Sequence, residues 1–515
     1  MSLENETEEN EESPGVVQRL VTFAQQRISK LVKSNIDHDQ ILGLIRVHNH
    51  FETVEMGSKR SESWLHFVHN QNTSEIHQDT SYKRAMSMIR TQAQFRDTSI
   101  ETLHNRIAMI NNSIYYDLKT NDWKLVEISQ NKVEIVEMNL QTPLFERKQH
   151  QREQVEYVIM SEKDSLGELV ELLRIQPQFQ QIFKIHVISM FLGDVPVPIM
   201  VTKGEQGSLK TTITKAVKRI VDPSGEEISS IPPKRDDLVL LLNNRFVPNF
   251  DNVSFISPTN SDILCRAVTG DGLSKRKLYS DSTEVIYSYK RKIILNGISF
   301  GMNRSDLMER CIVYETKAPS TLERMTEEEF DERFYALLPS LLGQIFTVLS
   351  KVLEMHKDVK SQIKEKPRMA DFAVYGECIS RALGYDDFSF IEDYAKKLEQ
   401  SSIGMIEDHQ LADAISKIME SNEKYEDTVQ NFFERARQIV MESGKELGKD
   451  FPAASNKVQS KVDRIKPNLR ILGFEISFNQ YTKNDEVFPK NRTIIKIEKN
   501  SSVISTIATE HTESK

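Results

Sequence analysis

Residues 197–221 read VPIMVTKGEQGSLKTTITKAVKRIV, and the interpretation of the whole chain depends on this stretch. The apolar run at 197–201 predicts a short buried strand. A glycine-bearing loop follows, and apolar positions at helical spacing after Lys210 predict an amphipathic helix. A strand, a loop and a helix in this order are the setting of a phosphate-binding loop, because the loop N–H groups and the helix N-terminus point at phosphate oxygens.

The loop departs from the phosphate-loop pattern at one position. The pattern GxxxxGK[ST] requires glycine at position 209, where this chain has Leu209, although Gly204 and Gly207 lie in the same loop. In that pattern Lys210 neutralises phosphate charge and the hydroxyl of Thr211 ligates Mg²⁺. Taken alone, the stretch fits an ordinary strand–turn–helix unit equally well, so the later motifs have to decide.

Length and composition indicate a soluble globular protein of three or four domains. The chain has 515 residues, of which 38% are hydrophobic and 28% charged. Its three cysteines are widely spaced, which is typical of a reducing compartment, and we expect a cytoplasmic protein without a signal peptide or membrane span. The net charge of −9 excludes an overall basic coat but still allows a local basic stripe that contacts nucleic acid.

The chain divides into six predicted parts. They are a disordered acidic tail (1–15), an N-terminal α+β module (16–150), a domain that contains the glycine-bearing loop (151–325), a helical lid or bundle (326–450), a winged-helix-like domain (451–500) and a disordered tail (501–515).

The N-terminal module carries no predicted catalytic site. Helical spacing appears at 16–34 and 80–110, and three short strands are predicted at 113–118, 123–128 and 132–136. Five histidines fall here, but no cysteine is near and their spacing matches no zinc pattern, so we expect surface or lightly buried histidines: His48, His50, His66, His69 and His77.

Four polar features follow the loop along the chain. A predicted strand ends in Asp251, which is placed to hold Mg²⁺, and Asn252 stands where a water-orienting glutamate is usual. Another predicted strand ends at Asn296, where an amide can hold water or a γ-phosphate oxygen. Basic residues at a predicted hairpin tip can reach DNA phosphates, although a solvated basic turn is the simpler alternative: Lys275, Arg276 and Lys277. Arg304 and Arg310 flank a short predicted helix and are candidates for contact with a neighbouring subunit's nucleotide.

The order of these motifs resembles a known family. GEQGSLKTT, FVPNFDNVS, DILCRAVTGDGLSKRKLYSD, RKIILNGI and RSDLMERCIVYE together resemble the ATPase module of mobile-element primase–helicase proteins. That module belongs to the AAA+ ATPases and is close to the superfamily three helicases. The N-terminal primase-polymerase domain of those proteins is missing here. The resemblance implies an α/β fold, with a P-loop AAA+ core of parallel strands flanked by helices.

The resemblance also assigns roles to individual residues. It implies Lys210 on the β- and γ-phosphates, Thr211 and Asp251 on Mg²⁺, and Asn296 as the sensor of the γ-phosphate. Arg310 would act in trans, with Arg304 the second choice. The general base is unassigned. The nucleotide would contact Gly204, Glu205, Gln206, Gly207, Ser208, Leu209, Lys210, Thr211 and Thr212.

The C-terminal third is predicted to be helical and then to form a winged helix. Apolar spacing predicts helices at 330–348, 369–383, 390–400, 403–420 and 429–447. Beyond Pro452, a helix at 456–465, a turn into a second helix, and strands at 474–478 and 493–497 match a winged-helix layout. Such domains bind DNA or protein. Here the basic residues that would meet the DNA backbone are Lys457, Lys461, Arg464 and Arg470, with Lys466, Lys490 and Arg492 adding charge.

The sequence therefore predicts an ATP-dependent DNA helicase or translocase of a mobile element. We expect a homo-oligomer, a hexameric ring, that uses ATP and Mg²⁺ on single-stranded or forked DNA, with a separate primase or polymerase as a further partner. Two alternatives remain: a replication initiator or loader ATPase that does not unwind, and a DNA-binding scaffold that Leu209 and Asn252 have left unable to hydrolyse ATP.

Overall fold

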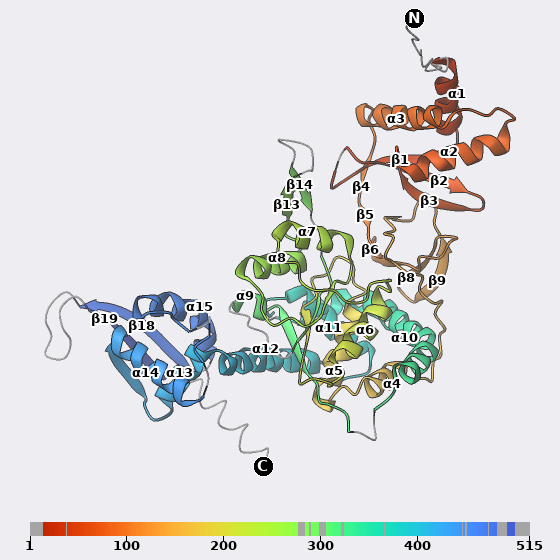
Figure 1. Cartoon of the computed structure of the whole chain (residues 1–515). Coiled ribbons are helices and arrows are strands. Elements are labelled where there is room, and N and C mark those ends of the chain that lie inside the picture. The colour runs from red at the N-terminus through yellow and green to blue at the C-terminus, as the bar shows by residue number, and fades with distance from the viewer. Residues whose placement is uncertain are drawn as a thin grey trace, which may run out of the picture.

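The computed structural model describes residues 14–37, 39–276, 284–287, 290–297, 305–320, 324–364, 366–444, 446–448, 451–471, 473–481 and 492–499. Figure 1 shows an N-terminal part, a central body and a C-terminal domain, and helix α12 runs from the body towards the C-terminal domain. The predicted disordered tails lie outside the described residues, except that the first helix already begins at Pro14.

The N-terminal part is a four-stranded sheet covered by three helices. The sheet order is β3-β2-β1-β4, and apolar residues of its strands and helices form one core. The predicted helix over 16–34 is wrong beyond residue 25, because 28–34 pairs antiparallel with the next strand. The elements are α1 (Pro14–Gln25), β1 (Ile28–Ser34), β2 (Ile41–Val47), β3 (His50–Glu55), α2 (Lys59–Asn72), α3 (Asp79–Phe95) and β4 (Ile100–Glu101).

An antiparallel meander connects this part to the central body. Its strands pair in the order β6-β7-β8-β9, and Tyr116 and Ile128 are buried in the same core as the central helices. The predicted helix over 80–110 thus ends at Phe95, and the three predicted strands are confirmed. The elements are β5 (Leu103–His104), β6 (Ile107–Ile110), β7 (Ser113–Asp117), β8 (Lys124–Ser129), β9 (Lys132–Glu137) and β10 (Leu144–Phe145), which pairs with β5.

A four-stranded parallel sheet with the order β12-β15-β11-β16 forms the centre of the body. Because all four strands run the same way, their carboxyl ends meet at one edge, where ligands bind in sheets of this kind. Residues 165–189 form two helices that are separated at a left-handed Arg174. The elements are α4 (Ser165–Leu172), α5 (Pro177–Ser189), β11 (Ile199–Lys203), α6 (Lys210–Val221), α7 (Arg235–Asn244), β12 (Asn249–Phe250), α8 (Pro258–Thr269), β15 (Ile294–Gly297), α9 (Ser305–Met308) and β16 (Cys311–Glu315). Between α8 and β15, β13 (Leu273–Arg276) and β14 (Glu284–Tyr287) form an antiparallel hairpin that projects from the body in Figure 1.

Three further helices pack on the body: α10 (Glu327–Gln362), α11 (Ala370–Ala382) and α12 (Ser389–Asp408). Helix α10 starts at a capping box in which Thr326 and Glu329 satisfy each other's backbone N–H groups. Among the described residues it is the one helix long and apolar enough to cross a membrane, but 72% of its apolar window is buried inside the protein. Its composition is therefore that of a core helix.

The C-terminal domain begins earlier than predicted. Residues from Leu411 to Ile497 share one core, so the domain starts near residue 410 and not at 451. A three-stranded antiparallel sheet of order β17-β19-β18 replaces the predicted two-stranded one, since 424–428 is a strand that sequence periodicity left inside the helical region. A single helix also replaces the predicted turn and second helix at 467–473. The elements are α13 (Gln410–Glu420), β17 (Lys424–Thr428), α14 (Val429–Glu442), a 3₁₀ turn (Ser455–Lys457), α15 (Val458–Ile471), β18 (Phe474–Tyr481) and β19 (Arg492–Lys499).

Candidate functional site

The loop between β11 and α6 turns through two left-handed residues. Gly207 has φ +81°, and Leu209 has φ 63° and ψ 7° directly before the first residue of α6. The left-handed region favours glycine because the Cβ of other residues meets a carbonyl oxygen there. Leu209 therefore adopts the backbone conformation that glycine at the same position of the phosphate-loop pattern would supply, and its side chain packs against the central core.

Gly204 is required for a different reason, which is close packing. A Cβ built on Gly204 would lie 2.4 Å from Thr316 Oγ1 and 2.5 Å from the Thr316 carbonyl oxygen. The buried Ser208 hydroxyl hydrogen-bonds to Thr316 Oγ1 at 2.8 Å and donates to the Glu205 carbonyl at 2.7 Å. Thr316, one residue past β16, thus fixes the loop. Sequence reasoning missed it because nothing in its neighbourhood resembles a motif.

Lys210 opens α6 and folds back over the loop. Its Nζ donates to the Gly204 carbonyl at 2.8 Å and to the Glu205 carbonyl at 2.5 Å. Partial burial lowers the pKa of the ammonium group, and the nearby Asp251 carboxylate opposes that shift. The positive charge is therefore held at the mouth of the loop, beside the first N–H groups of α6.

Thr211 and Asp251 meet across the edge of the sheet. The Thr211 hydroxyl donates to Asp251 Oδ1 at 3.3 Å, although the two residues are 40 positions apart. Asn252 has φ 53°, a conformation that asparagine tolerates better than glutamate does. A hydroxyl and a carboxylate side by side are oxygen ligands of the kind that Mg²⁺ takes, so this pair fits a magnesium ion.

Asn296, at the carboxyl end of β15, is buried and engaged on both sides. Its Oδ1 accepts from the Asn252 backbone N–H at 3.1 Å, and its Nδ2 donates to Thr214 Oγ1 at 3.3 Å. The amide therefore holds the turn that carries Asp251 against helix α6.

A cavity of about 460 Å³ lies beside the loop and α6. Thr212 lines it, whereas Glu205 and Gln206 are exposed on the outer side of the loop. Its walls combine apolar and basic side chains, among them Leu209, Ile213, Phe330, Arg174 and Arg324.

The far end of α6 is fixed by a buried ion pair. The Arg106 guanidinium, fully buried, donates to Asp222 Oδ1 at 3.0 Å and to the carbonyls of Asp117, Arg152 and Pro223. Lys218 Nζ lies 3.1 Å from Asp222 Oδ2. These two cations hold the pKa of the Asp222 carboxyl far below its usual range, although burial acts in the opposite direction.

Two family models match consecutive parts of the chain. One, described as "Actinomycete integrative conjugative element replication protein", matches residues 168–398, and the other, "AICE RepA C-terminal domain", matches residues 411–511. The chain belongs to this family of replication proteins. The resemblance to mobile-element replication proteins is thereby confirmed, and the start of the second match coincides with the start of the C-terminal core at Leu411.

Similar solved structures share little sequence with this replication protein. "SCCmec type IV Cch - active helicase" has a TM-score of 0.42 and 12% identity, over 93% of this chain and 94% of that chain. "The apo structure of NrS-1 C terminal region (305-718)" has a TM-score of 0.39 and 12% identity, over 94% of this chain and 99% of that chain. Comparison with the curated proteins gives no match.

Arg310 of the replication protein lies at the edge of the sheet opposite the loop. Its carbonyl accepts from Ile199, the first residue of β11, whereas the loop follows the last residue of that strand. Its Nη2 lies 3.6 Å from Asp306 Oδ1, and Arg368 pairs with Asp306 and Glu309 at the same place. Arg304 lies outside the described residues.

The predicted DNA-binding residues are only partly described. Lys275 and Arg276 belong to strand β13 of the projecting hairpin, but their side chains, like Lys277 and the side chain of Arg464, lie outside the description. Lys457 is exposed, and with Lys461 it lines a groove of about 820 Å³ between α14 and α15. Arg470 is exposed and pairs with Glu475 at 3.3 Å.

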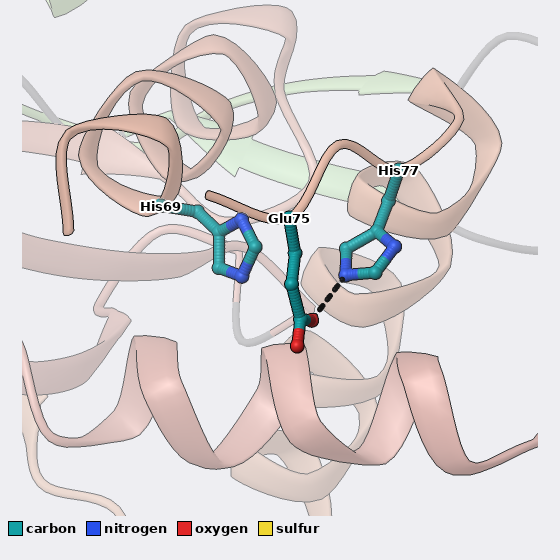
Figure 2. Close-up of side chains that lie close together, drawn as sticks. All are labelled: His69, Glu75 and His77. Atoms are coloured by element: carbon teal, nitrogen blue, oxygen red, sulfur yellow. Dashed lines mark hydrogen bonds and ion pairs between the residues drawn. The ribbon is translucent and has the colours of Figure 1, made fainter. Parts of the chain in front are cut away.

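One of the five N-terminal histidines, His69, differs from the prediction, and the other four are exposed or partly buried as expected. His69 is only 5% exposed, not a surface or lightly buried residue. One of its ring nitrogens, a carboxylate oxygen of Glu75 and a ring nitrogen of His77 all lie within 4.8 Å of one another (Figure 2). The spacing rule missed this group because it looked for cysteines and for zinc-finger intervals.

Proposed function

We propose that this replication protein is an ATP-dependent DNA helicase or translocase whose motor is a P-loop AAA+ ATPase. The observation that carries the proposal is the Thr211–Asp251 pair, 3.3 Å apart, next to Lys210 at the N-terminus of α6. A hydroxyl, a carboxylate, an ammonium group and free helix N–H groups at one edge of a parallel sheet are the donors that a nucleoside triphosphate with Mg²⁺ requires.

ATP would bind by displacing contacts within the loop. Lys210 would exchange the carbonyls of Gly204 and Glu205 for the β- and γ-phosphates, and Thr211 and Asp251 would hold Mg²⁺, which neutralises phosphate charge. The apolar walls of the neighbouring cavity would receive the base. Asn296 would keep Asp251 in position through the turn at Asn252.

The position of Arg310 supports assembly into a ring. The five residues of β11 separate it from the loop of its own subunit, a distance of about 16 Å at the usual rise per residue. Arg310 would therefore serve the nucleotide of a neighbouring subunit, as expected of a homohexamer.

DNA contacts would come from the hairpin and the C-terminal domain. The order α13-β17-α14-α15-β18-β19, with its three-stranded antiparallel sheet, supports a winged helix in which α15 and its basic residues meet the DNA backbone. The β13–β14 hairpin would contact one DNA strand inside the ring. The substrate would be single-stranded or forked DNA, and a separate primase or polymerase would be a further partner.

The test is DNA-stimulated ATP hydrolysis by the purified chain. Wild type should hydrolyse ATP and Lys210→Ala should not, while Lys132→Ala, an exposed lysine on β9, should behave as wild type. If wild type hydrolyses no ATP with any DNA, the motor is refuted in favour of the non-hydrolysing scaffold. Strand displacement on a forked duplex then distinguishes a helicase from a loader that hydrolyses ATP without unwinding.

A further inference from the structure

Three potential metal ligands converge in the N-terminal part, far from the nucleotide loop in the sequence. His69 lies on the last turn of α2, while Glu75 and His77 belong to the segment between α2 and α3. One ligand atom from each lies within 4.8 Å of the others. Figure 2 shows the Glu75 carboxylate between the two imidazole rings.

His69 is oriented so that one ring nitrogen remains available. Its Nδ1 lies 3.2 Å from the Tyr82 hydroxyl, which in turn lies 3.4 Å from Asn70 Oδ1. A chain in which Nδ1–H donates to Tyr82 and the Tyr82 hydroxyl donates to Asn70 leaves the Nε2 lone pair as the ligand. Metal-bound histidines are held in this way, by a hydrogen bond from the second nitrogen to a fixed acceptor.

Thr73 does not occupy that lone pair. Its Oγ1 lies 3.3 Å from Nδ1 and 3.4 Å from Nε2 of His69, and both contacts are longer than its contact with the His69 carbonyl. The single hydroxyl proton of Thr73 is donated to the His69 carbonyl at 3.0 Å, so this hydroxyl donates no hydrogen bond to Nε2. The Nε2 lone pair of His69 therefore remains available to a metal ion.

Glu75 and His77 already have the spacing of two ligands on one ion. His77 Nε2 and Glu75 Oε2 are 3.1 Å apart. Tetrahedral zinc with bonds of about 2.0–2.1 Å places neighbouring ligand atoms about 3.3 Å apart. A small movement of the exposed Glu75 side chain would bring both atoms within bonding distance of an ion that His69 also reaches.

One basic side chain near the three ligands competes with a metal ion for Glu75. Arg19, on α1, lies with its Nη2 3.7 Å from Glu75 Oε2 and competes with a cation for that carboxylate. Its side chain is 63% exposed and free to swing into solvent.

We propose that His69, Glu75 and His77 bind one divalent transition-metal ion, with Zn²⁺ the best match to two imidazoles and a carboxylate. The ion would tie the C-terminal turn of α2 to the segment that leads into α3. Three protein ligands leave a fourth position for water. The site is independent of the nucleotide site, because none of its residues belongs to the central body.

The test is metal titration of the full-length chain after treatment with a chelator. Co²⁺ is the probe, because its visible d–d absorption reports nitrogen ligands and tetrahedral geometry, and Zn²⁺ should displace it. Excess Mg²⁺ in the buffer fills the oxygen site at Thr211 and Asp251. We expect one saturable Co²⁺ site per chain.

Variants separate this site from adventitious histidine binding. His77→Ala and Glu75→Gln should each weaken Co²⁺ binding at least tenfold, and His66→Ala, one turn earlier on α2, is the matched control that should bind as wild type. Arg19→Ala should bind Co²⁺ more tightly, because it removes the competing cation. His69→Ala is avoided because the ring is packed in the core. The proposal is overturned if wild type has no saturable site, or if His77→Ala binds with the affinity of wild type.

Discussion

The left-handed backbone of Leu209 leads to a prediction about the nucleotide loop itself. Leu209→Val places a β-branched side chain at φ 63°, and Leu209→Gly removes the Cβ altogether. If the loop of the valine variant moves away from the left-handed conformation to relieve backbone strain, ATP binding has to restore that conformation. The cost of that restoration then appears in the affinity for ATP.

The magnitude follows from competing contributions. A left-handed conformation costs a non-glycine residue about 1–2 kcal/mol, and β-branched residues are the least tolerant of it. Leu209→Gly removes that cost. It also loses the packing of a partly buried leucine, which destabilises by about 1–1.5 kcal/mol, and it raises the entropy of the unfolded chain, which destabilises by about 0.5–1 kcal/mol. The glycine variant should therefore match wild type within about 1 kcal/mol. The valine variant should bind ATP about fivefold more weakly, which corresponds to about 1 kcal/mol.

The assay is equilibrium binding of a fluorescent ATP analogue, with thermal unfolding measured in parallel. Leu209→Asn is the matched control, because asparagine tolerates the left-handed region, and it should bind ATP as the glycine variant does. The reasoning is refuted if the valine variant binds as tightly as wild type while the glycine variant loses binding. That result would mean that the leucine side chain, and not the backbone, makes the site.

Three further predictions concern buried groups. Arg106→Met should lower the free energy of unfolding by about 3–5 kcal/mol, because the buried Asp222 carboxylate loses one of its two cations and three backbone carbonyls lose their donor. Thermal unfolding measures this loss, and the exposed control Lys132→Ala should show little change. Burial lowers the pKa of Lys292 to about 7 in the folded protein, so between about pH 7 and pH 10 only the unfolded chain keeps this proton. The free energy of unfolding of wild type should therefore rise with pH in this range, by up to about 1.4 kcal/mol per pH unit. Unfolding of Lys292→Met, measured at several pH values, should lack this rise. Asn296→Ala removes the buried amide that pairs with the Asn252 N–H and with the buried Thr214 hydroxyl, so thermal unfolding should show a cost of about 1–3 kcal/mol and ATP turnover should fall. Asn296→Asp keeps the acceptor oxygen but buries a carboxylate, so it should restore neither the stability nor the turnover.

Local patterns in the sequence predicted the central elements well. The apolar run before Lys203, the helix after Lys210 and a strand through Asn296 are present, because each buries an apolar face. The strand predicted before Asp251 is also present but spans only Asn249–Phe250. The errors lie where periodicity is ambiguous. Residues 28–34 contain apolar positions at spacings that fit a helix or a strand, and pairing with β2 decides in favour of the strand.

The C-terminal boundary was misplaced for a similar reason. Strand β17 is five residues long, polar at every position except Tyr425, and inserted between two strongly periodic helices. Only its pairing with β19, about 70 residues later, makes it a strand. A non-local partner of this kind leaves no signal in a window of the sequence.

Contacts between distant residues explain what the motifs missed at the sites. The pattern predicted that Thr211 and Asp251 hold one ion. It gave no sign that Thr316 packs against Gly204 and leaves no room there for a larger side chain. In the same way, the histidine intervals gave no sign that the turn after α2 folds Glu75 and His77 back towards His69. In both groups the deciding residue is one that the tertiary fold brings in.

Helix α6 links these observations, because it is fixed at both ends by different parts of the chain. Its N-terminus is the nucleotide loop, and near its C-terminal end Lys218 pairs with Asp222, which Arg106 of the meander also holds. Tyr116 of the same meander donates to the carbonyl of Val221, the last residue of α6. Tilting α6 would separate these buried groups, and an unpaired buried charge is costly. The loop is therefore held in place by the meander as well as by the sheet, and a substitution at Arg106 should be detected at the nucleotide site, about 18 Å away along a helix of 12 residues.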